Sequence, residues 1–70
     1  MALTARERVR AAEEAVRQLR EGLARAGVTL PSLRMDPLTA ADEGALPLVE
    51  LGRCNLDTAL RLAAVLEGPR

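Results

Sequence analysis

The chain has 70 residues with ten arginines, ten acidic residues and no net charge, and it contains one cysteine, no histidine and no aromatic residue. A domain of this size needs a disulfide, a structural metal or self-association to become stable. A single cysteine excludes an internal disulfide, and one cysteine without any histidine excludes the common zinc ligand sets, which leaves self-association. The zero net charge and the absence of aromatic rings also disfavour binding of polyanions and of stacked bases.

Composition and the order of charges indicate where the protein works. The use of arginine as the only basic residue, together with abundant alanine and leucine, is typical of GC-rich bacterial genomes. No apolar run approaches the roughly 18 residues that a membrane span requires. Arg6, Arg8 and Arg10 are followed by Glu13 and Glu14 instead of the apolar core of a signal peptide. We therefore expect a cytoplasmic protein without membrane contact, in a reducing compartment that suits a lone thiol.

The first predicted element is a long amphipathic helix over about residues 4 to 26. Thr4 and Glu7 have the spacing of a capping box, and Gly27 suits the left-handed position that ends a helix. Between them the apolar residues recur in alternating steps of four and three, which is a heptad pattern. This stripe consists of Ala5, Val9, Ala12, Val16, Leu19, Leu23 and Ala26.

The heptad stripe predicts a surface for association with a second chain. We expect its central residues to carry this interface, namely Val9, Ala12, Val16, Leu19 and Leu23. Two of the d positions of this heptad hold alanine, at Ala12 and Ala26, so the surface available to a partner helix is narrow. Gly22 lowers the stability of the helix by roughly 1 kcal/mol relative to alanine. The helix is therefore predicted to form one wall of a shared core, packing partly on the C-terminal half of its own chain and partly on a partner, and not to form an autonomous coiled coil.

The middle of the chain is predicted to form two short strands, at about residues 33 to 35 and 48 to 51. Proline and glycine interrupt the segment from 28 to 47, so no long helix crosses it. Antiparallel pairing would place Arg34 opposite Glu50 on the outer face. The apolar residues expected on the inner face are Leu33, Met35, Val49 and Leu51. Between the strands, residues 39 to 42 suit one helical turn capped by Thr39.

The last predicted element is a helix over about residues 55 to 67. Asn55 is a favourable N-cap, and Asp57 suits the positive end of a helix. More than half of the circumference is apolar, so we expect this helix to be sandwiched between other surfaces. The complete pattern predicts a single small α+β domain spanning residues 1 to 70, a helix-strand-strand-helix unit, with a mostly α fold as the alternative.

The sequence contains no pattern that identifies catalytic, cofactor-binding or metal-binding residues. Cys54 precedes the last helix and follows Arg53, and both features favour a thiolate. Without histidine to act as a base, however, a structural role for this small apolar side chain is the stronger interpretation. The adjacent acidic pairs at 13–14 and 42–43 point about 100° apart on a helix, so we expect them to be solvated.

The sequence leaves two candidate functions. The favoured prediction is a small homodimeric protein-interaction module, an adaptor or regulatory subunit without catalytic activity or cofactor, with a second protein as a further candidate partner. The alternative is a DNA-binding regulator with a degenerate helix-turn-helix in residues 38 to 67. The string from Leu51 to Ala59 loosely resembles a turn that leads into a recognition helix, in which Asn55, Thr58 and Arg61 would reach the DNA. Nucleic acid is the less favoured partner because Pro47 interrupts the helix that should precede this turn.

Overall fold

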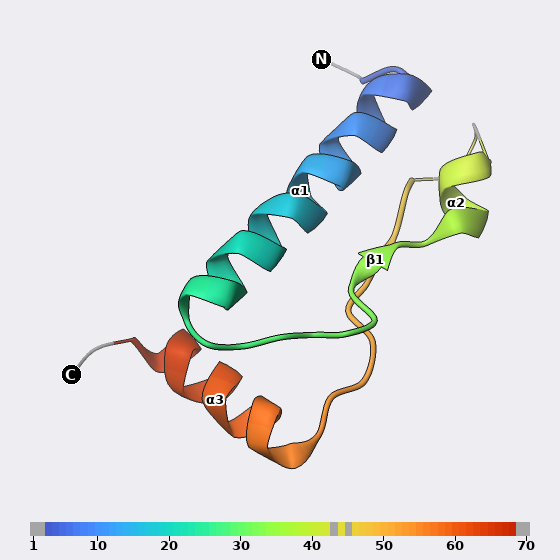
Figure 1. The fold of residues 1–70 in the computed structure, drawn as a ribbon. Coiled ribbons are helices and arrows are strands. Elements are labelled where there is room, and N and C mark those ends of the chain that lie inside the picture. Colours follow the sequence, from blue (N-terminus) through green and yellow to red (C-terminus); the bar gives the residue numbers. More distant parts are fainter. Residues whose placement is uncertain (1–2, 43, 45, 69–70) are drawn as a thin grey trace.

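The structure is a computed structural model that describes residues 3–42, 44 and 46–68. Its elements are α1 (Ala5–Arg25), β1 (Arg34–Met35), α2 (Pro37–Ala41), β2 (Val49–Glu50) and α3 (Leu56–Glu67). In Figure 1 the hairpin of β1 and β2 lies alongside α1, and α3 lies at one end of the molecule. The chain is flat and elongated, with extents of 40 × 24 × 15 Å. The predicted α+β order of helix, strand, strand and helix is confirmed.

Helix α1 begins and ends as the sequence predicts. The Glu7 amide donates to the Thr4 hydroxyl at 3.1 Å, while the Thr4 amide donates to the Glu7 carboxylate at 3.0 Å, which completes the capping box. At the other end, Gly27 has a φ of 76°. The Val28 amide donates to the Leu23 carbonyl and the Gly27 amide to the Ala24 carbonyl, which is the Schellman arrangement. This motif turns the chain back along the helix.

The two strands pair antiparallel in the predicted register, with Arg34 opposite Glu50 and Met35 opposite Val49. Arg34 and Glu50 form an ion pair at 2.9 Å on the exposed face. One expectation about the inner face is wrong, because Leu51 is exposed. The ladder ends at Glu50, and Gly52 follows with a φ of 78°. The chain therefore turns away before Leu51 reaches the core.

The helical turn between the strands is α2, and its cap differs from the prediction. The N-cap is Asp36, whose carboxylate accepts from the Leu38 amide at 3.2 Å, and Pro37 occupies the first helical position. Thr39 lies inside the helix instead of capping it. Its hydroxyl accepts from the Leu48 amide at 3.0 Å and so ties α2 to the segment that enters β2. The fixed φ of Pro37 suits the first position of a helix, so the helix begins earlier than the predicted turn.

The core is small and lies between α1 and the segment that follows it. Among the described residues, the buried apolar side chains are Ala12, Val16, Val28 and Leu33. Two of these come from the middle of α1 and two from the chain that runs back beneath it after the Schellman turn. Arg20 also joins the two layers, because its guanidinium donates to the Leu33 carbonyl at 2.5 Å. Helix α1 and the residues up to 35 therefore form the packed unit of the fold.

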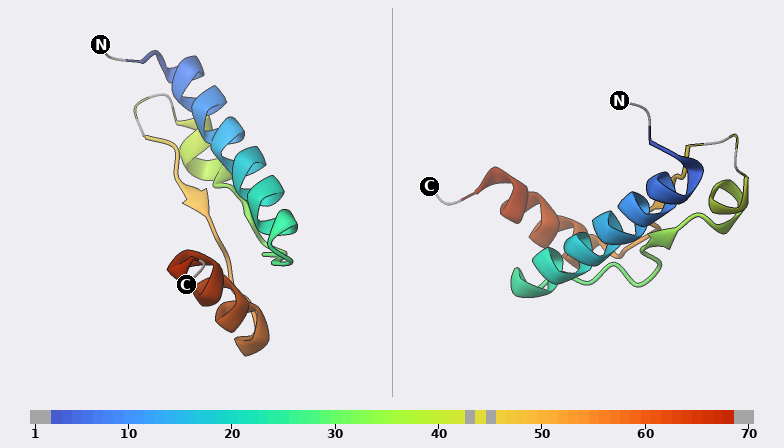
Figure 2. Two further views of the ribbon diagram at one scale, coloured as in Figure 1. Left: turned by 90° about the vertical axis from the view of Figure 1, so that its left-hand side faces the viewer. Right: turned by 90° about the horizontal axis from the view of Figure 1, so that it is seen from above.

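Helix α3 lies outside this unit, which corrects the expectation that it is sandwiched between surfaces. None of its residues is buried. The further views in Figure 2 show it beyond the layer formed by α1 and the hairpin. Only Thr58 and Leu62 are half-buried, and the other residues of the helix are exposed. Its apolar character was predicted correctly, but within this chain only a narrow side of it has a partner.

Candidate interaction surface

The five residues predicted to carry association lie at different depths in the structure. Ala12 and Val16 are only 8% and 5% exposed because they contact the chain's own core. Val9 and Leu23 are half-buried. Leu19 is the most accessible of the five, with an exposed fraction of 39%. The structure thus brings these residues together on one face of α1, and that face is largely occupied within the monomer. Their contact with a second chain stays a prediction.

The opposite side of α1 is charged and solvated. Arg17 forms ion pairs with Glu14 and, at 2.8 Å, with Glu21. The hydrogen bond from Arg17 lowers the pKa of the Glu14 carboxyl below its ordinary value. In turn, the carboxylates of Glu14 and Glu21 raise the pKa of the Arg17 guanidinium. Because all three side chains are about half exposed, these contacts contribute little to stability. This face interleaves both signs of charge, as expected for solvent exposure. Glu43, from the second predicted acidic pair, lies outside the described residues.

Helix α3 carries an exposed apolar surface. Leu56, Leu60 and Leu66 are 74%, 61% and 77% exposed. Together with Ala59 and Ala63, which are also exposed, they fall within an arc of about 120° on the helix. We call this surface the α3 face and define it by these five residues. The half-buried Leu62 and Thr58 lie on another side of the helix, toward the rest of the chain.

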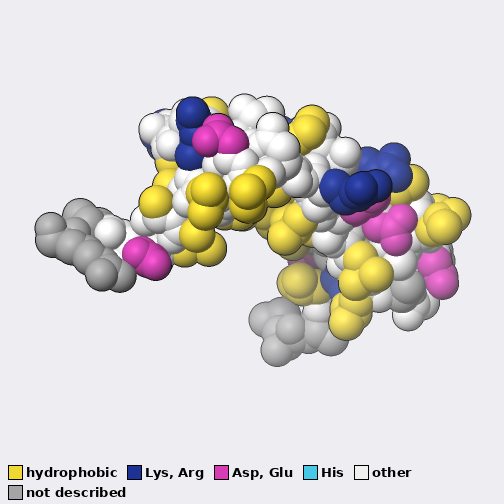
Figure 3. Space-filling view, turned by 90° about the horizontal axis from the view of Figure 1, so that it is seen from below, with side chains coloured by type: hydrophobic (Ala, Val, Ile, Leu, Met, Phe, Trp, Pro, Cys, Tyr) yellow, Lys and Arg dark blue, Asp and Glu magenta, His cyan; other side chains and the backbone are white. Residues whose placement is uncertain are grey.

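Figure 3 views the molecule from the side of α3 that is remote from α1. Hydrophobic side chains gather over this end of the molecule, and few charged atoms interrupt them. Asp57 and Arg61 lie one turn apart on the polar side of the helix and form an ion pair at 3.1 Å. An isolated exposed leucine is ordinary, but a contiguous apolar helix face is typical of an interaction site. The sequence predicted that other surfaces would cover this stripe, and within this chain no residue of α3 is buried.

A concavity of about 310 Å³ lies where α1 ends and the chain turns back. Its walls are mostly apolar and include Leu23, Leu30 and Pro31. The one charged group that lines it is Arg20, which is hydrogen-bonded to the Leu33 carbonyl. Acid–base catalysis requires titratable groups that converge on a pocket. This concavity lacks such a group of residues and fits an apolar contact better than a reaction.

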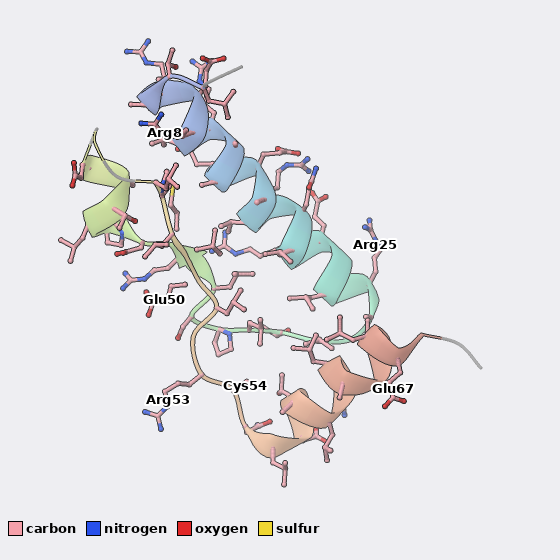
Figure 4. The ribbon with its side chains drawn as sticks, turned by 180° about the vertical axis from the view of Figure 1, so that it is seen from behind. Arg8, Arg25, Glu50, Arg53, Cys54 and Glu67 are labelled. Atoms are coloured by element: carbon pink, nitrogen blue, oxygen red, sulfur yellow. The ribbon has the colours of Figure 1, made fainter. Side chains whose placement is uncertain are left out.

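Cys54 is a free, exposed thiol just before the first turn of α3. In Figure 4 it lies beside the start of the helix, while Arg53 and Glu50 extend away from α1 on the outer side of the chain. Within residues 3–42, 44 and 46–68, no three residues with metal-binding side chains cluster to hold an ion. Cys54 therefore has no neighbouring ligand set in the described part of the chain.

The helices described by the structure do not have the combination of length and apolar character needed to cross a lipid bilayer. Comparison of the chain with protein-family profiles, curated proteins and solved structures gave no match.

Proposed function

We propose that the protein is a small interaction module that works as a homodimer, as an adaptor or regulatory subunit without catalytic activity of its own. The observation that carries this proposal is the unpartnered α3 face. A leucine moved from water into an apolar contact stabilises a structure by roughly 1.5 to 3 kcal/mol, and three leucines of this face are more than 60% exposed. A fold with so small a core gains much by covering them.

The total surface supports the same proposal. The chain exposes 5555 Å², whereas a compact monomer of its 7.5 kDa mass exposes roughly 4,200 Å². The excess of roughly 1,300 Å² is larger than the approximately 800 Å² that each partner buries in a standard protein interface. The radius of gyration agrees, since 14.1 Å exceeds the roughly 11 Å expected for a compact domain of this length. Association with a second chain through an interface of standard size would bury much of this excess surface.

Oligomeric state tests the proposal directly. Sedimentation equilibrium followed by interference optics suits a chain without aromatic residues, which is nearly transparent at 280 nm. We expect the mass of a dimer and a thermal midpoint that rises with protein concentration, because folding and association are then linked. A folded species that stays at the monomer mass over the whole concentration range would contradict the homodimer.

The proposed cellular location is the cytoplasm. Its support is the single free thiol, since a reducing compartment keeps such an exposed cysteine from forming disulfides between chains.

DNA binding receives no support from the arrangement of residues 38 to 67. A helix-turn-helix joins two helices by a turn of three or four residues. Here strand β2 and an extended segment lie between α2 and α3. The three side chains considered for DNA contacts are also engaged elsewhere, because Asn55 caps α3, Thr58 is half-buried and Arg61 pairs with Asp57. We therefore do not propose this function.

A further inference from the structure

We propose that the dimer forms by antiparallel packing of the α3 face against the same face of a second copy, across a two-fold axis that crosses the helix pair at the level of Arg61. This inference rests on the proposed homodimer and names its surface, its orientation and its register. The occupant of the face is thus a second copy of this chain.

The order of side chains along α3 suits antiparallel packing on a second copy, because leucine and alanine recur at equal distances on both sides of Arg61. Counting outward from Arg61, leucine stands five residues away on both sides, at Leu56 and Leu66, and alanine stands two residues away on both sides, at Ala59 and Ala63. In an isologous interface, residue i contacts residue j of the partner and residue j contacts residue i. Antiparallel packing centred on Arg61 therefore places Leu56 opposite Leu66 of the second copy, and Ala59 opposite its Ala63.

The sizes of these side chains also fit a close helix pair. Interaxial distances of packed helices are about 8 to 10 Å and depend on the side chains at the contact. Alanine near the crossing point permits the shorter distance, while the leucines at both ends of the face cover the flanks. Leu60 lies next to the proposed axis, so its two copies meet there. The antiparallel orientation also sets the positive end of each helix beside the negative end of the other.

Helix α3 is free to accept this partner without any change in the packed unit. The buried residues of the described chain lie in α1 and in the segment from 28 to 33, so pairing of α3 needs none of them. The ion pair of Arg61 and Asp57 lies on the polar side of the helix and stays solvated. The proposed contact therefore adds a second apolar layer to the fold and leaves the first one intact.

A charge introduced at the proposed axis tests the surface. Leu60→Arg places two cations next to each other in the dimer, so we expect the dissociation constant to rise at least about tenfold. Leu38→Arg is the matched control, because Leu38 is 81% exposed and lies outside α3, on α2. Both leucines are exposed in the monomer, so both variants should keep the wild-type helical signal. The expected result is a weakened dimer for the first variant and an unchanged dimer for the second.

Disulfide trapping tests the orientation. In a Cys54→Ser background, Ala59→Cys protein is mixed with ¹⁵N-labelled Ala63→Cys protein and oxidised. Antiparallel packing predicts mixed disulfides between the labelled and unlabelled chains, since a disulfide requires Cα atoms about 4.4 to 6.8 Å apart. Parallel packing in register predicts disulfides within each population instead, and the two results differ in mass.

The outcomes separate this inference from the proposed function. A dimer that tolerates Leu60→Arg and yields no mixed disulfide would show that a different surface associates, which overturns the α3 pairing but not the homodimer. A wild-type chain that is monomeric throughout overturns both. Mixed disulfides together with weakening confined to Leu60→Arg support both proposals.

Discussion

The guanidinium of Arg20 in α1 donates a hydrogen bond of 2.5 Å to the main-chain carbonyl of Leu33, which lies thirteen residues further along the chain. This contact joins the helix to the returning segment at the point where that segment enters β1. Because Leu33 is buried and its carbonyl accepts from a charged donor, the bond is stronger than an exposed contact between neutral groups.

Removal of this donor should destabilise the fold. We expect Arg20→Ala to lower the free energy of unfolding by about 1 to 2 kcal/mol, at or below the lower end of the range for charged hydrogen bonds, because the Arg20 side chain is largely exposed. Urea unfolding followed by circular dichroism at 222 nm measures this change. Arg10→Ala, at an exposed position of the same helix, serves as the control and should change stability by less than about 0.5 kcal/mol. Equal losses in the two variants would contradict the role assigned to the Leu33 contact.

Truncation of the core should have a larger effect. Leu33 is only 2% exposed, and replacing a buried leucine by alanine costs about 2 to 5 kcal/mol. The total stability expected for 70 residues is only about 3.5 to 10 kcal/mol. We therefore expect Leu33→Ala to lose much of its cooperative thermal transition. Leu38→Ala removes the same atoms from an exposed side chain and should melt close to the wild type. A cooperative Leu33→Ala transition at the wild-type temperature would place the core elsewhere.

Two glycine substitutions should change stability in opposite directions. A Cβ atom at Gly52 would lie 2.4 Å from the Cβ of Ser32, and the φ of 78° also disfavours any side chain. Gly52→Ala is therefore expected to destabilise the fold by more than about 1 kcal/mol. A Cβ at Gly22 meets no atom within 4 Å, and this residue lies inside α1. Gly22→Ala should stabilise by up to about 1 kcal/mol through its higher helix propensity. A thermal midpoint of Gly52→Ala at or above the wild-type value would refute the predicted geometry at Gly52, and a lowered midpoint of Gly22→Ala would refute the prediction for Gly22.

Stability should fall in acid because of two carboxylates of α1. The hydrogen bonds from Thr4 lower the pKa of Glu7, and the hydrogen bond from Arg17 lowers the pKa of Glu14. Both carboxyls therefore bind protons less readily when folded, so their stabilising contribution is present above the ordinary pKa of 4.5 and is lost as the pH falls through the lowered values. We expect the thermal midpoint to drop as the pH decreases below about 5.

The variant Glu7→Gln/Glu14→Gln isolates this effect. Glutamine keeps an oxygen acceptor for the capping box but does not titrate. The double variant should show a smaller loss of thermal midpoint between neutral and acidic pH than the wild type, when both are followed by circular dichroism. Parallel pH profiles for the two proteins would assign the acid sensitivity to other carboxyls.

Local structure was predictable from the sequence because short-range contacts determine it. The Thr4–Glu7 capping box, the left-handed Gly27 and the Asn55 cap each depend on residues within one turn of a helix. The pairing of Arg34 with Glu50 was also predictable, since the period of two along each strand determines which side chains share a face. In each case the required partner lies close in sequence or follows from a fixed repeat.

The depth of each apolar residue depended on the tertiary structure. The hydrophobic effect has no direction, so a leucine stripe predicts that a surface will be covered but not which segment covers it. The sequence predicted burial for Leu51 and for the wide face of α3, yet the short ladder, the turn at Gly52 and the placement of α3 leave both exposed. By contrast, the Schellman turn sends the chain back along α1, and Val28 and Leu33 of the returning segment are buried, as are Ala12 and Val16 of the helix. That turn determines which part of the α1 stripe is occupied within the chain, and the separation of α3 leaves its apolar face accessible to a second copy.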